Sequence, residues 1–314
     1  MTNTIVISEF MDEPAVERLR QVAQVDYRPE LVDNRELLLR SLVTASALIV
    51  RNRTQVNKEL IDQSPQLKVV GRLGVGLDNI DMELCKEKGI TVYPAVGANA
   101  QAVAEYVIAT AFILLRGAYL SSSQIIDGTW PRNTLSTGLE MSGKKLGLVG
   151  FGGIGRLTAS LARGLGMKVA AYDPMIAADS PVWTQTGASS LSLGDLLTQS
   201  DVVSLHTPLT NDTRHLINAE RLALMKKQAV LINTSRGGIV DEKALIAALK
   251  DGALRGAALD VFEDEPVKAG NSLPAMSNLI LTPHIAGLTE EANERVSGVI
   301  AEKVMEYFQQ DGIT

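Results

Sequence analysis

The chain has 314 residues, enough for two domains of roughly 150 residues each, and its 46% hydrophobic and 21% charged residues exclude a mainly disordered chain. Lys and Arg number 30 against 36 Asp and Glu, and the net charge of −6 argues against a general nucleic-acid binder, because contacts to phosphates need a basic face. The single cysteine, Cys85, excludes an intramolecular disulfide and a cysteine-based zinc site.

The first part of the sequence alternates short runs rich in Val and Ile with longer segments of helical period, which is typical of βαβ units and a parallel sheet. The pattern predicts strands at Thr4–Ser8, Val25–Tyr27, Ala47–Val50, Leu67–Val70 and Ile90–Tyr93. Between them it predicts helices at Pro14–Ala23, Asn34–Leu42 and Ile80–Lys88. A longer helix is expected at Asn99–Gly117, with Gly117 as its terminator.

A second series of the same kind begins at Lys145. It predicts strands at Leu146–Val149, Lys168–Tyr172, Val202–Leu205, Ala229–Asn233, Gly256–Val261 and Leu279–Leu281. The predicted helices are Ile154–Leu165, Ser192–Gln199, Ala219–Lys227 and Glu242–Lys250, and the last three are expected to be capped by Ser192, Asn218 and Asp241. One long amphipathic helix, Glu290–Phe308, closes the series. Two α/β domains with parallel sheets are therefore expected.

The sequence also bears on location. The N-terminal MTNTIVISEF has no basic segment followed by a long apolar core, so it does not resemble a secretory signal. No apolar run approaches the ~20 residues of a membrane span, and the segment Ala102–Leu115 is interrupted by Glu105. We therefore expect a cytoplasmic protein with no membrane partner and no nucleic-acid partner.

A glycine-rich turn, Gly150-Phe-Gly152-Gly-Ile-Gly155, lies between a predicted strand and a predicted helix. A lone G-x-G-x-x-G is a weak signal, but here a second strand follows and ends in Asp173. We expect Gly150 to allow the tight turn, Gly152 to let the backbone approach a pyrophosphate, and Gly155 to permit close helix–strand packing. Asp173 is expected to accept hydrogen bonds from the adenosine ribose and to repel the extra phosphate of NADP, which favours NAD. The alternative is a tight turn that binds nothing.

Three polar side chains follow predicted strands in the second half of the chain. They are Arg236, Glu265 and His284, the last being one of only three histidines. In open parallel sheets, ligands bind outside the carboxyl ends of the strands, so these side chains can meet in one crevice with the cofactor. Taken singly, each side chain has a structural alternative. Arg236 could be a surface charge, Glu265 a solvated loop carboxylate, and His284 a structural histidine with its hydrogen bonds made within the fold. Their joint occurrence favours catalysis.

Several segments together resemble one family. GFGGIG with YDP, HTPLT, INTSRGGIVDE, ALDVFEDEP and TPHIAG are similar to the D-isomer-specific 2-hydroxyacid dehydrogenases, which include D-3-phosphoglycerate dehydrogenase, over essentially the whole chain. The resemblance implies a Rossmann NAD-binding domain at residues 100–285, inserted in a flavodoxin-like substrate domain at residues 1–99 and 286–314. It also implies a homodimer built through the cofactor domains, with a tetramer left open.

The resemblance further implies a role for each of the three side chains. His284 takes the proton of the C2 hydroxyl during oxidation and returns it during reduction, because the pKa of an imidazole is ordinarily near neutrality. Glu265 orients the imidazole, and Arg236 holds the substrate carboxylate and polarises the C2 oxygen. No metal is expected, because no histidine pair has ligand spacing. Further cofactor contacts are expected from Gly153, Ile154, His206, Thr207, Pro208, Thr213, Thr234, Ser235, Asp260, Ala286 and Gly287.

Arginines also follow strands of the first domain. The resemblance implies that Arg51 and Arg72 match positions facing the distal phosphate in phosphoglycerate dehydrogenases, and Arg132 is expected to reach the pocket from one subunit or the other. Guanidinium groups gathered in an acidic protein call for a doubly anionic substrate, and the alternative is that they are surface charges. The expected substrate-binding residues are Arg51, Arg53, Arg72, Leu73, Gly74 and Arg132.

A three-carbon 2-hydroxyacid with a strong anion at C3 fits this pattern. The segments ISEFMDE, LIVRNRTQV and GRLGVGLDNID most resemble the (S)-sulfolactate dehydrogenases, so we expect NAD-dependent interconversion of (S)-3-sulfolactate and 3-sulfopyruvate. The sequence shows no regulatory domain after the closing helix, so feedback by serine is not expected. The alternatives are D-3-phosphoglycerate dehydrogenase, a broad reductase of 2-keto acids such as hydroxypyruvate or glyoxylate, and an NAD-sensing interaction protein.

Overall fold

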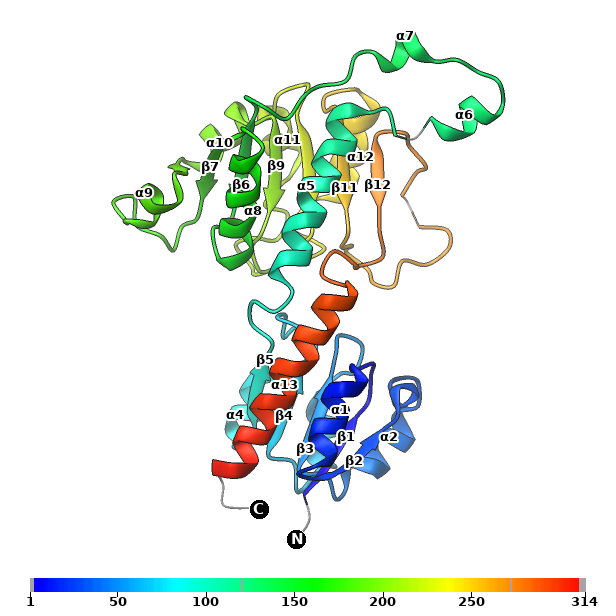
Figure 1. Cartoon of the computed structure of the whole chain (residues 1–314), viewed down its shortest axis with the longest axis vertical. Coiled ribbons are helices and arrows are strands. Elements are labelled where there is room, and N and C mark those ends of the chain that lie inside the picture. Colours follow the sequence, from blue (N-terminus) through cyan, green and yellow to red (C-terminus); the bar gives the residue numbers. More distant parts are fainter. Residues whose placement is uncertain (1–2, 120, 272, 311–314) are drawn as a thin grey trace. The chain divides into compact units, whose positions relative to one another are not determined.

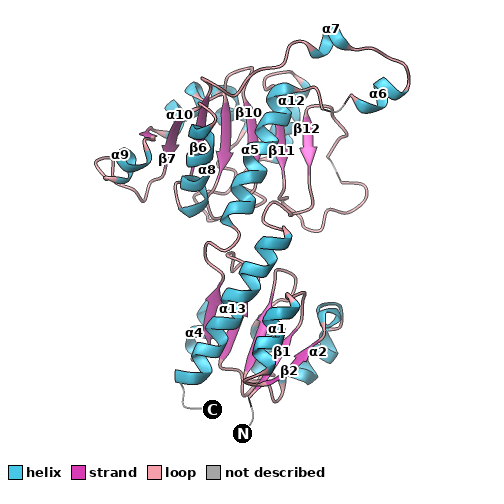
Figure 2. Ribbon diagram, viewed as in Figure 1, coloured by secondary structure: helices cyan, strands magenta, loops and turns pink. Residues whose placement is uncertain are grey.

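The computed structural model describes residues 3–119, 121–271 and 273–310 (Figure 1). The chain divides into two compact units. The described residues of Met1–Asn99 and Leu288–Thr314 form what we call the terminal unit, and those of Ala100–Gly287 form the central unit. Figure 2 shows that in each unit a set of strands is flanked by helices.

Within its described residues, the terminal unit is built on a five-stranded parallel sheet in the order β2-β1-β3-β4-β5, the order of flavodoxin-like sheets. Its strands are β1 (Thr4–Ile7), β2 (Gln24–Tyr27), β3 (Ala47–Val50), β4 (Val69–Arg72) and β5 (Thr91–Pro94). Successive residues of β1 point to opposite faces, so Ile5 and Ile7 pack with one set of helices and Val6 packs with the other. One face is covered by α1 (Glu13–Arg20) and α13 (Glu290–Gln310), and the other by α2 (Arg35–Leu42), α3 (Lys58–Asp62) and α4 (Met82–Glu87).

The central unit contains, among the described residues, a seven-stranded parallel sheet in the order β12-β11-β10-β9-β6-β7-β8. With β6 counted as the first strand, this is the Rossmann order extended by a seventh strand at one edge. The strands are β6 (Lys145–Val149), β7 (Lys168–Tyr172), β8 (Ser189–Ser190), β9 (Val202–Leu205), β10 (Val230–Asn233), β11 (Gly256–Leu259) and β12 (Leu279–Leu281).

Helices cover both faces of this sheet. On one face, α5 (Ala100–Arg116) and α8 (Gly153–Gly164) lie side by side and bury Leu146 and Leu148 of β6 (Figure 1). On the other face lie α10 (Leu193–Gln199), α11 (Ala219–Leu224) and α12 (Glu242–Lys250). Two short helices, α6 (Ser122–Ile126) and α7 (Arg132–Leu135), lie on a long connection between α5 and β6. Among the described residues, no helix is both long enough and apolar enough to cross a membrane.

The predicted caps are confirmed, because the side chains of Ser192, Asn218 and Asp241 each accept a hydrogen bond from the N–H three residues ahead. Gly117 adopts a left-handed φ of 66° directly after α5, as expected for a helix terminator. The helix predicted to reach Lys227 ends at Leu224, because Met225 is already extended with ψ of 152°. The short elements were not predicted, because two to five residues are too few to display a period; they are α3, α6, α7, α9 (Val182–Thr186), η1 (Pro29–Asp33) and β8.

Candidate active site

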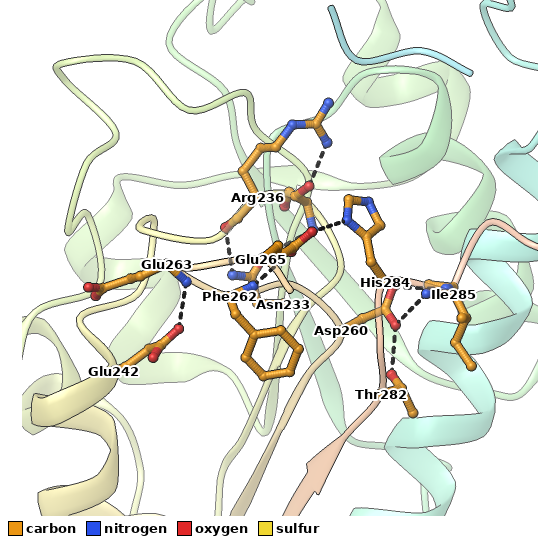
Figure 3. A network of polar contacts seen from close by, with 12 residues as sticks. Asn233, Arg236, Glu242, Asp260, Phe262, Glu263, Glu265, Thr282, His284 and Ile285 are labelled. Atoms are coloured by element: carbon orange, nitrogen blue, oxygen red, sulfur yellow. Dashed lines mark hydrogen bonds and ion pairs between the residues drawn. The ribbon is translucent and has the colours of Figure 1, made fainter. Parts of the chain in front are cut away.

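The polar residues singled out in the central unit lie at the carboxyl ends of its strands. His284 follows β12, Glu265 lies on the loop after β11, and Arg236 follows β10. Because all these strands are parallel, their carboxyl ends share one edge of the sheet. Figure 3 shows the three side chains gathered at this edge.

The imidazole of His284 is hydrogen-bonded to the carboxylate of Glu265, with 2.7 Å between Nδ1 and Oε2. An ionised carboxylate can only accept a hydrogen bond, so Nδ1 carries the proton and donates the hydrogen bond to Glu265. In the neutral ring, Nε2 is then left with a free lone pair. The pair therefore fixes the tautomer in which Nε2 can take a proton from a ligand.

Glu265 is held in its charged form by its neighbours. Partial burial opposes ionisation, but the hydrogen bonds from His284 and from the N–H of Phe262, together with the charges of His284 and Arg236, lower the pKa of Glu265 below its usual value. Glu242 accepts a hydrogen bond from the N–H of Glu263 at 2.8 Å and so ties the same loop to α12. The carboxylate partner of His284 thus sits on a restrained loop.

Arg236 is positioned by the turn that precedes it. The side chain of Asn233 accepts the N–H of Ser235 and donates to the carbonyl of Arg236, which closes the turn after β10. Gly237 then packs directly on the next loop, since a Cβ placed there would lie 1.7 Å from the carbonyl oxygen of Phe262. Only glycine allows the Arg236 turn and the loop of Glu265 to approach this closely.

His284 itself has a left-handed backbone with φ of 56°, a conformation that costs a non-glycine residue about 1–3 kcal/mol. The buried carboxylate of Asp260 offsets this cost by accepting the N–H groups of Ile285 and Ala286, each at 2.8 Å, and the hydroxyl of Thr282 at 2.7 Å. The N–H of His284 also bonds to the carbonyl of Asp260. Asp260 was expected to contact the cofactor. Its carboxylate organises the loop at residues 282–286 that carries His284, which we call the histidine loop, and Oδ2 keeps a lone pair for a ligand.

The glycine turn has both structural and open positions. Gly150 has φ of 94°, and a Cβ there would lie 2.4 Å from the carbonyl oxygen of His206, while a Cβ on Gly155 would lie 2.6 Å from the carbonyl oxygen of Gly150. The fold therefore requires both of these glycines. Gly152 differs, because among the described residues, its chain neighbours aside, no heavy atom lies within 4 Å of an added Cβ. The space beside Gly152 is what a pyrophosphate at the start of α8 needs, so the turn fits a dinucleotide.

Two further observations at this edge fit a dinucleotide. The hydroxyl oxygens of Thr207 and Thr234, which follow β9 and β10, are buried without a hydrogen-bond partner among the described residues. A bound ligand would supply the partner that a buried hydroxyl needs. Beside them, desolvation lowers the pKa of His206 to about 4, and its Nε2 lies 3.0 Å from the hydroxyl of Ser204. His206 is therefore neutral at physiological pH.

Asp173 lies directly after β7 and joins the glycine turn to its own loop. Its Oδ2 accepts the N–H of Phe151 and its Oδ1 accepts the N–H of Met175, at 2.8 and 2.9 Å. Each oxygen keeps a lone pair for a ribose hydroxyl. The acid thus stands where the adenosine ribose of a dinucleotide would lie.

Other residues expected to contact the cofactor are engaged in their own loops. The hydroxyl of Thr213 donates to the carbonyl of Pro208 and accepts from the N–H of Thr210, and the hydroxyl of Ser235 donates to the carbonyl of Leu205. Their side chains shape the loops, which leaves their backbone groups as possible ligand contacts. The remaining expected contacts lie at the start of α8 and at the end of the histidine loop: Gly153, Ile154, Ala286 and Gly287.

In the terminal unit, Arg51 follows β3 and is held from several sides. Its Nη2 donates to Oδ1 of Asn293 on α13 at 2.9 Å, and its guanidinium lies 5.6 Å from the ring centre of Phe10. The buried carboxylate of Glu9 accepts the backbone N–H groups of Arg51, Arg53 and Thr54. Burial lowers the pKa of Arg51 from its ordinary value, against the opposing charge of Glu9. The site presents a partly desolvated, oriented guanidinium.

The other arginines expected to bind substrate are placed differently. The guanidinium of Arg53 is exposed and paired with Asp33. Arg72 folds over its own turn, with Nη1 donating to the carbonyl of Leu73 at 3.0 Å and lying against Gly74. Arg132 is an exposed residue at the start of α7. Arg51 differs from Arg53 and Arg132 in combining burial with contacts to a neighbouring helix and an aromatic ring.

Sequence reasoning missed the residues that support these side chains. Glu9, Phe10 and Asn293 around Arg51, and Tyr106 and Thr282 around Asp260, carry no motif of their own. A faint signal was present for Thr282, which lies inside the TPHIAG segment. Glu9 and Phe10 lie inside the ISEFMDE segment, although nothing in that segment points to Arg51. For Asn293 and Tyr106 the sequence carries no signal, because their contacts exist only in the folded chain.

A Rossmann sheet with an open glycine turn, an acid after its second strand and a histidine–carboxylate pair at the same edge defines a dinucleotide-dependent oxidoreductase. Comparison with known proteins agrees: the sequence profile of the D-isomer specific 2-hydroxyacid dehydrogenase, NAD binding domain, matches residues 108–286. The chain belongs to this family and is an NAD-dependent 2-hydroxyacid dehydrogenase.

Three relatives illustrate the range of the family. The chain is 53% identical to the (S)-sulfolactate dehydrogenase of Chromohalobacter salexigens, over 96% of both chains. It is 39% identical to the D-3-phosphoglycerate dehydrogenase of Methanocaldococcus jannaschii, over 96% of this chain but 56% of that protein. The crystal structure of D-lactate dehydrogenase from Aquifex aeolicus, complexed with NAD and lactic acid, is similar with a TM-score of 0.84 and 30% identity, over 98% of this chain and 96% of that one.

Proposed function

We propose that the chain interconverts a D-configured 2-hydroxyacid carrying a second anion at C3 and its 2-keto acid, most specifically (S)-3-sulfolactate and 3-sulfopyruvate. The observation that carries the proposal is the oriented guanidinium of Arg51, held by Asn293 and Phe10 after β3. A partly desolvated arginine that is already oriented binds a tetrahedral anion strongly, because its planar fork loses little freedom on binding. The 53% identity to a sulfolactate dehydrogenase supports the sulfonate as that anion.

The proposed chemistry uses the three side chains at the edge of the central sheet. Nε2 of His284 accepts the proton of the C2 hydroxyl during oxidation, while the carboxylate of Glu265 stabilises the imidazolium that forms. Arg236 holds the C1 carboxylate and polarises the C2 oxygen. Bound NAD supplies the acceptor for the hydrogen that leaves C2 with its electron pair. Gly152, Asp173, Thr207 and Thr234 would hold the cofactor.

A substrate panel tests the proposal. Rates with sulfolactate, 3-phosphoglycerate, lactate and glycerate are measured by nicotinamide absorbance with NAD and with NADP. We expect the highest kcat/KM for sulfolactate with NAD. Higher values for phosphoglycerate would support the second candidate, D-3-phosphoglycerate dehydrogenase, which the 39% identical relative favours. Equal values for lactate and sulfolactate would contradict a site for a second anion.

A variant tests the residue that carries the argument. Arg51→Ala should raise KM for sulfolactate by roughly 10- to 100-fold, the value of a hydrogen bond to a charged group, and should change KM for lactate far less. Arg40→Ala is the matched control, because Arg40 is an exposed residue of α2 paired with Glu36. An unchanged ratio of the two KM values in Arg51→Ala would remove Arg51 from the substrate site.

We also propose that the active form is a homodimer in which a second copy covers the connection carrying α6 and α7. Every residue of these two helices is at least partly exposed, and Ile126 and Trp130 are 84% and 76% exposed. Two large apolar side chains so exposed, four residues apart in the sequence, mark an interaction surface. Sedimentation equilibrium should show that the wild-type protein is a dimer and that the double variant Ile126→Asp with Trp130→Ala dimerises more weakly. A monomeric wild type would contradict the proposal. Arg132, at the start of α7, would then lie at this interface.

A further inference from the structure

A hydrogen-bond chain links α5 to the histidine loop of the central unit. The hydroxyls of Tyr106 and Thr282 lie 2.5 Å apart, and Thr282 lies 2.7 Å from Oδ1 of Asp260. Because the carboxylate of Asp260 can only accept, Thr282 donates to Asp260 and must accept from Tyr106. The chain therefore runs in one direction, from Tyr106 through Thr282 to Asp260.

Asp260 connects this chain to the backbone on both sides of His284. Thr282 stands two residues before the histidine, and Ile285 stands directly after it (Figure 3). The N–H groups of Ile285 and of the next residue, Ala286, bond to the same carboxylate. The strained backbone of His284 thus lies between two attachments to one buried acid. Moving that acid or loosening either attachment would move the imidazole.

We propose that Tyr106 and Thr282 are positioning residues that hold His284 for proton transfer through Asp260. The proposal rests on the proposed role of His284. Tyr106 belongs to the 17-residue helix α5, which packs on α8, β10 and β11, so the chain begins on a rigid element. Its donated hydrogen bond polarises the Thr282 hydroxyl and strengthens the bond that Thr282 makes to Asp260. Neither residue touches the reacting atoms; both act through the shape of the loop.

Three substitutions test the chain. Tyr106→Phe removes one neutral hydrogen bond and should lower kcat by about three- to tenfold, whereas Thr282→Val removes a bond to a charged group and should lower kcat by roughly 10- to 100-fold. Thr282→Ser keeps the hydroxyl and should keep kcat near wild type. The dissociation constant of NAD, measured by fluorescence titration, should change less than kcat does in the two slower variants, because the glycine turn and Asp173 are untouched and only the cofactor contacts expected from the loop of His284 are disturbed.

The double variant makes the test specific. In Thr282→Val the hydroxyl of Tyr106 no longer has the Thr282 hydroxyl as its acceptor. The double variant Tyr106→Phe with Thr282→Val should therefore be no slower than Thr282→Val alone. Tyr307→Phe on α13 in the terminal unit is the matched control and should leave kcat unchanged. Losses that multiply in the double variant, a Thr282→Ser as slow as Thr282→Val, or single variants within about twofold of wild type would overturn the proposal.

His284→Asn separates this inference from the proposed function. Thermal unfolding first confirms that every variant is folded. If His284→Asn retains turnover, the proton transfer assigned to His284 fails, and the positioning role fails with it. If His284→Asn loses turnover while Tyr106→Phe and Thr282→Val keep it, the positioning role alone fails. Loss of turnover in His284→Asn together with the predicted losses in Tyr106→Phe and Thr282→Val supports both.

Discussion

Replacing Gly152 by alanine separates what the fold requires from what the cofactor requires. Gly152 has φ of −74° and ψ of −162°, a backbone that other residues adopt readily. Among the described residues, its chain neighbours aside, no heavy atom lies within 4 Å of the added Cβ. The free protein therefore has room for the methyl group. A bound pyrophosphate does not leave that room, because it needs close approach to this backbone.

Two magnitudes follow from this geometry. Alanine is a poorer residue than glycine at the N-cap of α8, at a cost of about 1 kcal/mol or less, which lowers Tm by roughly 2–4 °C. An extra methyl group in a close-packed contact costs about 1–3 kcal/mol. The dissociation constant of NAD should therefore rise by roughly 5- to 150-fold.

The assay pairs NAD titration, by calorimetry or fluorescence, with thermal unfolding of the free protein. Gly164→Ala is the matched control, because Gly164 is the exposed last residue of α8. Its own helix and chain neighbours aside, no heavy atom of the described residues lies within 4 Å of its added Cβ. This control should bind NAD as the wild type does and gain up to about 1 kcal/mol of stability. Unchanged NAD affinity in Gly152→Ala would refute the placement of the pyrophosphate beside this turn.

Three other predictions concern the same edge of the sheet. Gly237→Ala should lower the free energy of unfolding by about 3 kcal/mol and should also lower kcat, because its Cβ would lie 1.7 Å from the backbone oxygen of Phe262. Calorimetry and rate measurements check this, and a variant as stable as wild type would contradict it. The pKa of His206 is lowered to about 4 in the folded protein. As pH falls from about 6.5 to 4, His206 is protonated in the unfolded chain and stays neutral in the folded chain. About 3 kcal/mol of stability is therefore lost over that range. Urea unfolding at several pH values should show that His206→Asn lacks this loss, and equal slopes for both proteins would contradict it. Glu265 has a lowered pKa, so its contribution to stability is present above about pH 4.3 and is lost as pH falls further. The difference in unfolding free energy between wild type and Glu265→Gln should therefore shrink below that pH. A constant difference would count against the pairing with His284.

Much of the secondary structure could be predicted because its causes are local. A run such as Leu146–Val149 alternates between two buried faces, and Ser192 caps its helix through an N–H only three residues away. The glycine turn is likewise a short segment whose φ angles depend on its own residues. Local causes have the same effect in any fold, so pattern reasoning finds them.

The support of the site could not be predicted because its partners are distant in the chain. Arg51 meets Asn293 across 242 residues, and Tyr106 meets Thr282 across 176. Asp260 illustrates the difference, since its sequence context suggested a cofactor contact and the fold adds a second task, the restraint of the histidine loop.

The alternation of strands and helices, the family and the dinucleotide turn can all be read from the residues alone, because each depends on short segments and residue types. Which side chains meet depends on how the chain folds. The contact between His284 and Glu265, and the hydrogen bonds that hold each of their loops, exist because parallel strands deliver their carboxyl ends to one edge. The burial of the Thr207 and Thr234 hydroxyls, which have no hydrogen-bond partner among the described residues, also depends on the fold, because burial is a property of the assembled sheet and helices.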